Sequence, residues 1–343
     1  MGTTPPKKPP QGGFFIMKVL IVSLDNVGDT VISLAIHEAL RGVDGLGAAW
    51  WTKDYSRAVV PLAGAHIEHY RCDPFWDRSP GAGKGGLLPF LRTILALRRA
   101  RFDAALIVHG NWRKNLACLL AGIGRRYSAK GAFATDPVTV KGPHVLDSCR
   151  ALLAAFLGRD PGELSYPLSP AAYGESRAAR ELFTGGWAVV HPFSGNPARN
   201  LPLLAWPAVL EPLAAAGLRV LVNVSPAEKE LFNRTARGPY AARPADLVFS
   251  CDLGLSIADL AYAVSRAAVF VGNNSGPLHL ASALGTPCVG VFQRSWVPRI
   301  APRGKFHPLL ALFTDSPAEI PQDEVPALVR RLLSARDGRP HNC

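Results

Sequence analysis

The sequence predicts an α/β fold with two domains, each built on a parallel sheet with helices on both faces. The chain has 343 residues, which is too long for one ordinary hydrophobic core and suits two domains of roughly 150 residues each. Apolar residues make up 48% of the chain and charged residues 19%, as in folded globular proteins. Short β-branched runs alternate with longer helical patterns in both halves, which favours parallel strands joined by helices.

The first domain is expected over residues 17–165. It opens with the apolar run KVLIVS, typical of a strand buried in a parallel sheet. The turn LDNVGD then leads into the helical pattern TVISLAIHEALR, and GLLPFLRTILALRRAR predicts a second helix with arginines near its C-terminal end, where the helix dipole favours cations. The predicted strands of this domain are Lys18–Ser23, Ala48–Trp51, His66–Tyr70 and Ala104–Gly110.

The second domain repeats this rhythm over residues 170–320. The Pro- and Gly-rich segment Gly158–Pro170 is predicted to link the domains, and a C-terminal helix, DEVPALVRRLLSAR, is expected within residues 321–343 with one apolar face packed on the protein. The predicted strands are Trp187–Phe193, Arg219–Ser225, Leu247–Ser250, Ala268–Asn273 and Cys288–Phe292, with helices WPAVLEPLAAAG and LSIADLAYAVSRA between them. Both halves are therefore predicted to be Rossmann-like domains, with an interdomain ligand cleft at the carboxyl ends of their strands.

Several functional classes are disfavoured by what the sequence lacks. It has no run of 18 uncharged apolar residues that would predict a transmembrane helix. Residues 1–16 lack the apolar region of a signal peptide, so they are expected to be a disordered extension, with Met17 an alternative start and the protein in the cytoplasm. The six cysteines include no C-x-x-C pair; this argues against a zinc or redox motif and favours buried free thiols.

The net charge is +12, and most of it falls in the first half. Up to residue 165 there are 21 basic and 13 acidic residues, an excess of +8, against 17 and 13 after it, an excess of +4. A basic surface of this size suits nucleic acid, an anionic membrane or an anionic substrate. No helix-turn-helix, RNP or zinc-finger signature supports nucleic acid.

The first candidate site is the turn LDNVGDT, between the first predicted strand and the first helix. Ligands of parallel α/β sheets bind at the carboxyl ends of strands, and this turn places Asp25, Asn26, Gly28 and Asp29 there. It is not a G-x-G-x-x-G sequence, so no nicotinamide-binding motif is present. Asp29 offers a carboxylate base; the alternative interpretation is that it only caps the helix.

The second candidate site is VGNNSGPLHLASALGTP, where a predicted strand ends at Asn273. Ser275 is expected to be the N-cap of the next helix, with Gly276 and Pro277 in its first turn, and His279 lies one turn in. Backbone N–H groups and the positive end of a helix dipole suit a diphosphate. The alternative is an ordinary capped turn between a strand and a helix.

The third candidate site is the loop HPFSGNPARNLP, again after a predicted strand. Ser194, Gly195 and Asn196 are expected to form a small polar turn, and the planar guanidinium of Arg199 suits a phosphate. The alternative is a solvated loop with an exposed arginine. Together the three motifs offer one base and two phosphate-binding groups at one expected cleft.

These motifs resemble those of glycosyltransferase family 9, the ADP-heptose:lipopolysaccharide heptosyltransferases and their relatives. The resemblance runs from about Met17 to Leu333, and its most specific part is VGNNSGPLHLASALGTP, against V-G-N-D-S-G-P-M-H-L-A-A-A-L-G-T-P in the family. It implies a GT-B fold, an inverting mechanism, no metal or cofactor, and a nucleotide-sugar donor resembling ADP-heptose. It also implies an acceptor-binding first domain, a donor-binding second domain, and a lipid-linked or glycan acceptor.

The resemblance also assigns residues by motif position. Asp29 matches the catalytic base, and Arg199 matches a phosphate-binding lysine. The remaining residues divide into a donor side and an acceptor side, namely Ser194, Asn274, Ser275, Gly276, Pro277 and His279 for the donor and Asp25, Asn26 and Gly28 for the acceptor. Arg199 replaces the lysine, Asn274 an aspartate associated with the donor sugar, and Leu201 a tryptophan; these differences concern the donor sugar more than the reaction class.

The function expected is therefore transfer of a sugar to a lipopolysaccharide-core or related glycan acceptor, with heptose as the leading candidate for the sugar. The alternatives are a nucleotide-sugar epimerase and a catalytically silent sugar- or nucleic-acid-binding protein; the intact Asp29 favours an enzyme, and Asn274 favours the silent binder. Peripheral contact with the inner membrane is expected through basic residues of the first half. The alternative interpretation is that these residues are scattered over a solvated surface and serve only solubility. These residues are Arg98, Arg99, Arg101, Arg113, Lys114, Arg125 and Arg126.

Overall fold

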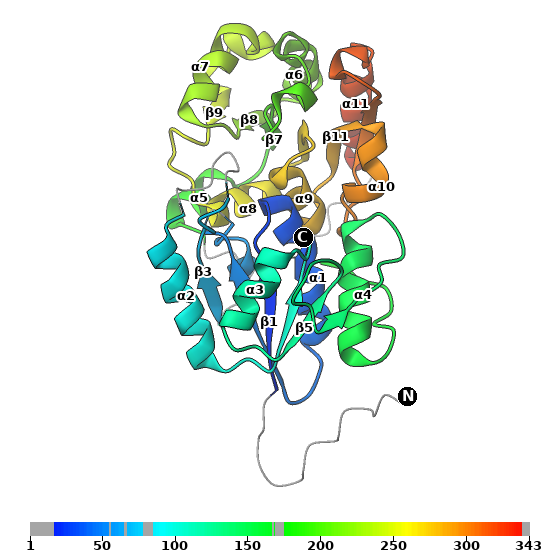
Figure 1. Cartoon of the computed structure of the whole chain (residues 1–343). Helices are drawn as coiled ribbons and strands as arrows, with labels where there is room; N and C mark the ends of the chain where they lie inside the picture. Colours follow the sequence, from blue (N-terminus) through cyan, green and yellow to red (C-terminus); the bar gives the residue numbers. More distant parts are fainter. Residues whose placement is uncertain are drawn as a thin grey trace. The chain divides into compact units, whose positions relative to one another are not determined.

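The computed structural model describes residues 17–54, 56–64, 67–77, 85–166, 168 and 175–337. Its contacts divide the chain into two units, Met1–Tyr166 and Pro167–Cys343. Each unit contains a six-stranded parallel sheet with helices between the strands (Figure 1), as predicted for the fold class. The expected extension at residues 1–16 and the end of the chain beyond residue 337 lie outside the described residues.

The sheet of the first unit has the strand order β3-β2-β1-β4-β5-β6, and every pair is parallel. Its strands are β1 (Met17–Ser23), β2 (Leu46–Thr52), β3 (His69–Arg71), β4 (Ala104–Ile107), β5 (Arg125–Ser128) and β6 (Asp136–Pro137). The chain winds one way from β1 to β3 and the other way from β4 onward. The switch between β1 and β4 opens a crevice at the carboxyl ends of these two strands.

Helices cover both faces of this sheet. They are α1 (Val27–Leu40), α2 (Leu87–Ala100), α3 (Trp112–Leu120) and α4 (Val145–Leu157), with the 3-10 turn η1 (Val60–Ala63) after β2. Helix α1 packs with α4, and α2 packs with α3 on the opposite face. Val19 to Val22 of β1 are completely buried, which explains why the central strand is apolar at consecutive positions rather than at alternate ones.

The sheet of the second unit has the order β12-β11-β10-β7-β8-β9, again all parallel. Its strands are β7 (Trp187–His191), β8 (Arg219–Val222), β9 (Leu247–Phe249), β10 (Val269–Asn273), β11 (Cys288–Gln293) and β12 (Leu309–Phe313). The same winding pattern places the switch point between β7 and β10. Each sheet therefore has a switch point, the place at whose carboxyl edge ligands bind in parallel α/β sheets.

The helices of the second unit also form two layers. They are α5 (Arg177–Leu182), α6 (Trp206–Ala215), α7 (Pro226–Thr235), α8 (Ile257–Arg266), α9 (Gly276–Leu284), α10 (Val297–Ile300) and α11 (Glu324–Asp337), with 3-10 turns η3 (Pro197–Arg199), η4 (Leu203–Ala205), η5 (Gly238–Ala241), η6 (Pro244–Asp246), η7 (Arg294–Trp296) and η8 (Pro317–Glu319). Helices α6, α7 and α11 contribute to one core, and α5, α8 and α9 to the other. The C-terminal helix packs through Val325 and Val329, which are buried.

Several elements were not predicted from the sequence. Strand β5 has the sequence RRYS, in which two arginines hide the strand pattern, and β6 has only two residues; strand β12 and helices α3, α4, α5 and α7 were also not predicted. The first helix begins at Val27, and its N-cap is Asn26. The alternative interpretation of Asp29 as the cap is therefore wrong, because the helix starts earlier than its apolar periodicity indicated.

Two further properties concern the described residues only. Their five cysteines are free; Cys251 is partly exposed and the other four are buried, while Cys343 lies outside the described residues. Among the described helices, none is both long and apolar enough to cross a membrane.

Replacing Asp259 with Asn should destabilise the second unit by about 1–2 kcal/mol at neutral pH. The buried Asp259 carboxylate accepts hydrogen bonds from the backbone N–H groups of Ser176 (2.6 Å) and Ser256 (3.0 Å) and from the Ser256 hydroxyl (2.7 Å). Burial alone would raise the pKa of Asp259, but these bonds hold it below its usual 3.8. The stabilisation is therefore present above pH 3.8 and lost as the pH falls through the lower folded-state pKa.

Urea unfolding of the wild type and of Asp259→Asn at a series of pH values tests this expectation. The stability difference should shrink at acidic pH, and Asp323→Asn, which alters an exposed carboxylate, should have little effect. A difference that is independent of pH would show that the charge of Asp259 does not stabilise the fold.

Candidate functional site

A pocket of about 250 Å³ lies at the carboxyl edge of the first sheet. The segments that follow β1, β2, β3 and β4 all contribute to it, as expected for the switch point of a parallel sheet. Its walls combine carboxylates, ammonium groups, two amides and an indole. The lining residues are Leu24, Asp25, Asn26, Asp29, Lys53, Pro74, Trp76, Asp77, Asn111 and Lys114.

Two carboxylates of this pocket form close ion pairs with buried lysines. Lys114 Nζ lies 2.8 and 2.9 Å from the two carboxylate oxygens of Asp25 and 2.9 Å from the carbonyl oxygen of Val108, which together use its three protons. Lys53 Nζ lies 2.5 Å from Asp77 Oδ2. Both lysines are about 4% exposed, so loss of either carboxylate would leave a buried cation without its ion pair, at a cost of several kcal/mol.

Asp29 has a different environment. It is the third residue of α1, near the positive end of the helix dipole, which favours a negative charge. Its Oδ1 atom lies 3.5 Å from Nε2 of His109, and its side chain is 18% exposed. Asp29 is thus a carboxylate in the pocket wall that pairs with an imidazole.

His109 is held beside Asp29 by an unusual backbone conformation. Its φ is 45°, in the left-handed region that is costly for residues with a side chain and is often found at functional sites. Gly110 follows, and a Cβ atom there would collide with the Ser128 hydroxyl. The turn after β4 therefore requires glycine at position 110 and directs the preceding imidazole towards Asp29.

The sequence analysis did not identify several residues of this pocket. Lys53 lies two residues after the predicted strand Ala48–Trp51. His109, which contacts the pocket residue Asp29, lies at the end of the predicted strand Ala104–Gly110. The carboxyl-end rule applied to every strand would have found both residues. Lys114 was expected on a lipid-facing surface, but it is buried against Asp25.

Arg126 was expected on the same surface, and this expectation is also wrong. It is 6% exposed, and its guanidinium donates to the backbone carbonyl groups of Ile123, Gly124 and Phe133. These bonds replace the water that a charged group would otherwise require. Arg125 is exposed, and its guanidinium lies 2.9 Å from Asp136.

In the second unit, the loop after β7 is anchored to the neighbouring strand β10 by Asn273. This buried side chain donates from Nδ2 to the carbonyl oxygen of Pro192 (2.5 Å) and accepts at Oδ1 from the N–H group of Leu201 (2.9 Å). One amide thus satisfies both ends of the loop, and Leu201 is buried below it. Within the loop, Ser194 Oγ lies 3.0 Å from the carbonyl oxygen of Asn196, which closes the predicted polar turn, and 2.6 Å from Asn200 Oδ1.

Arg199 ends the 3-10 turn η3 of this loop and stacks on an aromatic ring. Its guanidinium carbon lies 4.3 Å from the ring centroid of Trp296 in η7, and Arg299 approaches the same ring at 5.7 Å. An arginine on the face of an indole is stabilised by the ring quadrupole and keeps its N–H groups available in the plane of the guanidinium. The carboxyl edge of the second sheet therefore carries a cation of fixed orientation.

Helix α9 begins at the carboxyl end of β10, beside the anchored loop. Ser275 occupies the N-cap position, as predicted, but its hydroxyl donates back to the carbonyl oxygen of Asn273 (3.0 Å) and does not cap the helix. Gly276 and Pro277 form the first turn, and Asn274 is half-buried before it. His279 is 1% exposed, so its imidazole is buried rather than on the surface.

The structure therefore groups the predicted residues into two sets. Asp25, Asn26, Gly28 and Asp29 lie together after β1, and the donor-side residues lie together after β7 and β10. Among the described residues, no group of three or more His, Cys, Asp or Glu side chains is placed to hold a metal ion.

The Asp29→Asn substitution should lower the pKa of His109. Burial and Lys114 oppose the imidazolium charge, but the hydrogen bond to Asp29 and the negative charges of Asp25 and Asp29 outweigh them and raise the pKa of His109 above its usual 6.5. An NMR titration of the histidine side chains measures the change. His191, whose pKa is lowered by burial in the second unit, should titrate unchanged; an unchanged His109 would contradict the proposed coupling.

Comparison with known proteins identifies relatives that share this architecture. The Escherichia coli ADP-heptose lps heptosyltransferase II superposes with a TM-score of 0.74 at 16% identity, covering 94% of this chain and all of that one. The E. coli heptosyltransferase WaaC with ADP gives 0.74 at 19% identity, covering 92% and 100%. A family 9 glycosyl transferase from Veillonella parvula gives 0.75 at 15% identity, covering 93% and 97%. These similarities show that the fold is shared.

Sequence comparison leads to the family. A putative glycosyltransferase from Haemophilus influenzae is 31% identical over 110 residues, which span 32% of this chain and only 31% of that relative. The model of glycosyltransferase family 9 (heptosyltransferase) matches residues 90–313, more than half of the chain. The chain therefore belongs to glycosyltransferase family 9, the heptosyltransferase family.

Proposed function

We propose that this family 9 glycosyltransferase transfers a sugar from a nucleotide-diphosphate sugar donor to a lipopolysaccharide-core or related glycan acceptor. Heptose is the leading candidate for that sugar. The observation that carries the proposal is that each sheet has chemically suited groups at its switch point, a carboxylate at the helix start in the first unit and an oriented arginine beside a helix start in the second. The E. coli relative WaaC was solved with ADP and with ADP-2-deoxy-2-fluoro heptose, which supports a donor resembling ADP-heptose.

Asp29 is proposed to act as the general base. It accepts the proton of an acceptor hydroxyl while that oxygen forms a bond to the anomeric carbon, and the bond from this carbon to the diphosphate oxygen breaks. A single displacement of this kind inverts the anomeric configuration. Asp29 lines the pocket beside the imidazole of His109, where its carboxylate is placed to accept a proton.

The donor diphosphate is proposed to bind between Arg199 and the start of α9. The leaving group gains negative charge as its bond breaks, and charge-assisted hydrogen bonds from a guanidinium together with the positive end of a helix stabilise that charge. These groups would take the role that a divalent metal has in other transferases. Ser194 and Ser275 hold the local loop geometry, and His279 is a buried residue of the first turns of α9.

The differences from the family motif bear on the choice of donor sugar. Asn274 is neutral where the family has a carboxylate, so it would donate as well as accept hydrogen bonds with the sugar. Leu201 is buried with its backbone held by Asn273, which indicates that it replaces the tryptophan as a packing residue. Gly276 and Pro277 belong to the diphosphate turn.

The acceptor is proposed to bind the first unit, in the pocket that contains Asp29. Asn111 and Trp76 offer an amide and an indole, the groups that proteins use for sugar hydroxyls and sugar faces. Asn26 is exposed at the rim, whereas Gly28 is buried and Asp25 is paired with Lys114, so the latter two would shape the site. A lipid-linked acceptor would place the enzyme in the cytoplasm, peripherally at the inner membrane.

Asp29→Asn should reduce turnover by roughly a hundredfold or more, the usual effect of losing a general base, while donor binding stays nearly unchanged. The assay uses ADP-heptose with a lipopolysaccharide-core acceptor, in EDTA because the proposed reaction needs no metal, and a donor-only reaction serves as the control for epimerisation. More than half of the wild-type turnover in Asp29→Asn would remove the residue from catalysis. A complete loss of wild-type activity in EDTA, with activity restored by magnesium, would contradict the proposal that the reaction needs no metal.

Arg199→Ala should weaken donor binding and turnover together, by about 1.5–3 kcal/mol for a lost charge-assisted hydrogen bond. Arg199→Lys should recover much of the loss, because it restores the charge without the planar stack on Trp296. Calorimetry with ADP measures the binding. The matched control is Arg219→Ala, which removes an arginine stacked on Trp187 at 4.1 Å at the amino end of a strand; equal ADP affinity in Arg199→Ala and wild type would exclude Arg199 from the site.

A further inference from the structure

The outer surface of helix α2 carries leucines that the fold leaves exposed. Helix α2 packs on the first sheet through Phe90, Ile94 and Leu97, which are at most 5% exposed. A surface helix of a globular protein normally has polar residues on its remaining faces. Four leucines instead face solvent, namely Leu87 (56%), Leu88 (61%), Leu91 (42%) and Leu95 (52%).

Helix α3 extends this apolar surface. It packs beside α2 on the same face of the sheet, and Arg98 Nη1 at the end of α2 lies 3.3 Å from the carbonyl oxygen of Leu120 at the end of α3. Trp112, Leu119 and Leu120 of α3 are 48%, 40% and 49% exposed. We refer to the exposed residues of α2 and α3 as the α2–α3 face; patches of this kind on an otherwise folded domain mark interaction sites.

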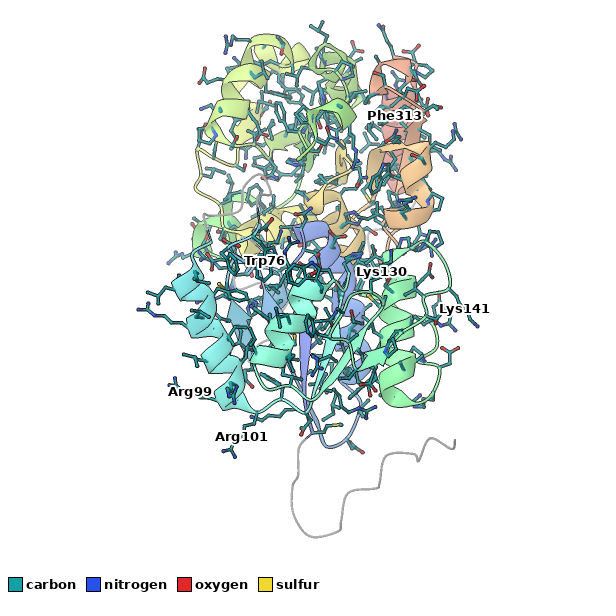
Figure 2. The ribbon with its side chains drawn as sticks, viewed as in Figure 1. Trp76, Arg99, Arg101, Lys130, Lys141 and Phe313 are labelled. Atoms are coloured by element: carbon teal, nitrogen blue, oxygen red, sulfur yellow. The ribbon has the colours of Figure 1, made fainter. Side chains whose placement is uncertain are left out.

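Every charged residue on the α2–α3 face is basic. Residues 87–101 and 112–126 contain no Asp or Glu. Arg92, Arg98, Arg99, Arg101 and Arg113 are all exposed, and Figure 2 shows Arg99 and Arg101 extending outward from the C-terminal end of α2. A face that combines exposed leucines and a tryptophan with arginines, and has no acidic residue, is complementary to a surface that is apolar inside and anionic outside.

We propose that the α2–α3 face binds peripherally to an anionic lipid surface. Leucines of an interfacial helix insert at the boundary between headgroups and acyl chains, arginines attract the lipid phosphates, and tryptophan prefers this boundary. A second copy of the chain fits less well, because a symmetric contact would bring the same arginines together.

The location of the α2–α3 face connects it to the acceptor pocket. Trp76 lines the pocket and packs against Phe90 of α2 with ring centroids 5.0 Å apart. In Figure 2, Trp76 lies near the end of α2 opposite Arg99 and Arg101. Arg113 at the start of α3 lies between the pocket residues Asn111 and Lys114, so a lipid phosphate held by Arg113 would lie close to the pocket; this link to the acceptor rests on the function proposed above.

Vesicle binding of the full chain tests the proposal. Sedimentation with vesicles of 70% phosphatidylcholine and 30% phosphatidylglycerol should show binding at low salt that weakens as ionic strength rises, and little binding to phosphatidylcholine alone. The triple variant Leu88→Gln, Leu91→Gln, Leu95→Gln should lower the partition coefficient about tenfold or more. The double variant Arg92→Glu, Arg99→Glu should lower the partition coefficient at least about fivefold for each positive charge removed. Glutamine preserves helix propensity, and circular dichroism checks the fold.

Two further measurements make the outcome specific to this face. The matched control variant replaces Leu204, Leu231 and Leu253, which are exposed on the second unit at 80%, 45% and 41%, with glutamine and should bind like wild type. Brominated lipids should quench tryptophan fluorescence in wild type but not in Trp112→Phe. Wild type that ignores anionic vesicles, a leucine variant that binds as tightly as wild type, or an oligomer that the leucine variant dissociates would overturn the proposal.

These experiments contain no donor or acceptor, so their result is independent of the proposed reaction. A protein that binds vesicles through the α2–α3 face but transfers no sugar would retain the lipid-binding inference and reject the proposed function. If the protein transfers sugar but the leucine variant binds vesicles as tightly as wild type, only the lipid-binding inference is rejected.

Discussion

The covering of both sheets on both faces is the constraint on which the site depends. Strand residues such as Val19–Val22 and Val269–Val271 are completely buried, and an uncompensated charge there would be expensive. Chemically active side chains are therefore confined to the segments that leave the strands. Because all strands of a sheet are parallel, these segments collect at one edge, and the reversal of winding beside β1 and β7 separates them into a crevice. The candidate groups of both units lie at these reversals.

In the first unit, charge pairing distinguishes three carboxylates that belong to one pocket. Asp25 and Asp77 are neutralised by buried lysines at 2.5–2.9 Å, whereas Asp29 lies 3.5 Å from an imidazole. Fixed pairs of this kind hold a polar site in place before a ligand binds, which reduces the reorganisation that a reaction requires. The strained backbone of His109 is part of the same arrangement, because the tight turn at Gly110 determines where the imidazole lies.

In the second unit, the loop that carries Arg199 is held in place by contacts that reach across the sheet. Asn273 bonds both ends of the loop, and Trp296, from the segment after β11, supports the guanidinium. Arginine in place of the family's lysine is consistent with this environment, since a planar guanidinium stacks on an indole whereas an ammonium group is a compact point charge. Arg199 and Trp296 lie in the segments after β7 and β11, and Asn273 is the last residue of β10, so the geometry depends on the order of strands in the sheet.

The sequence by itself determined the fold class, most strands of both sheets, the turn containing Asp29 and the helix start at Ser275, because burial periodicity and turn chemistry are local. Only the tertiary structure decided which side chains meet. Lys114 and Asp25 are 89 residues apart, and no local pattern distinguishes a lysine that closes a buried pair from one on a solvated surface. The strand order brings β1 beside β4, and that adjacency made Lys114 a pocket residue and His109 the partner of Asp29.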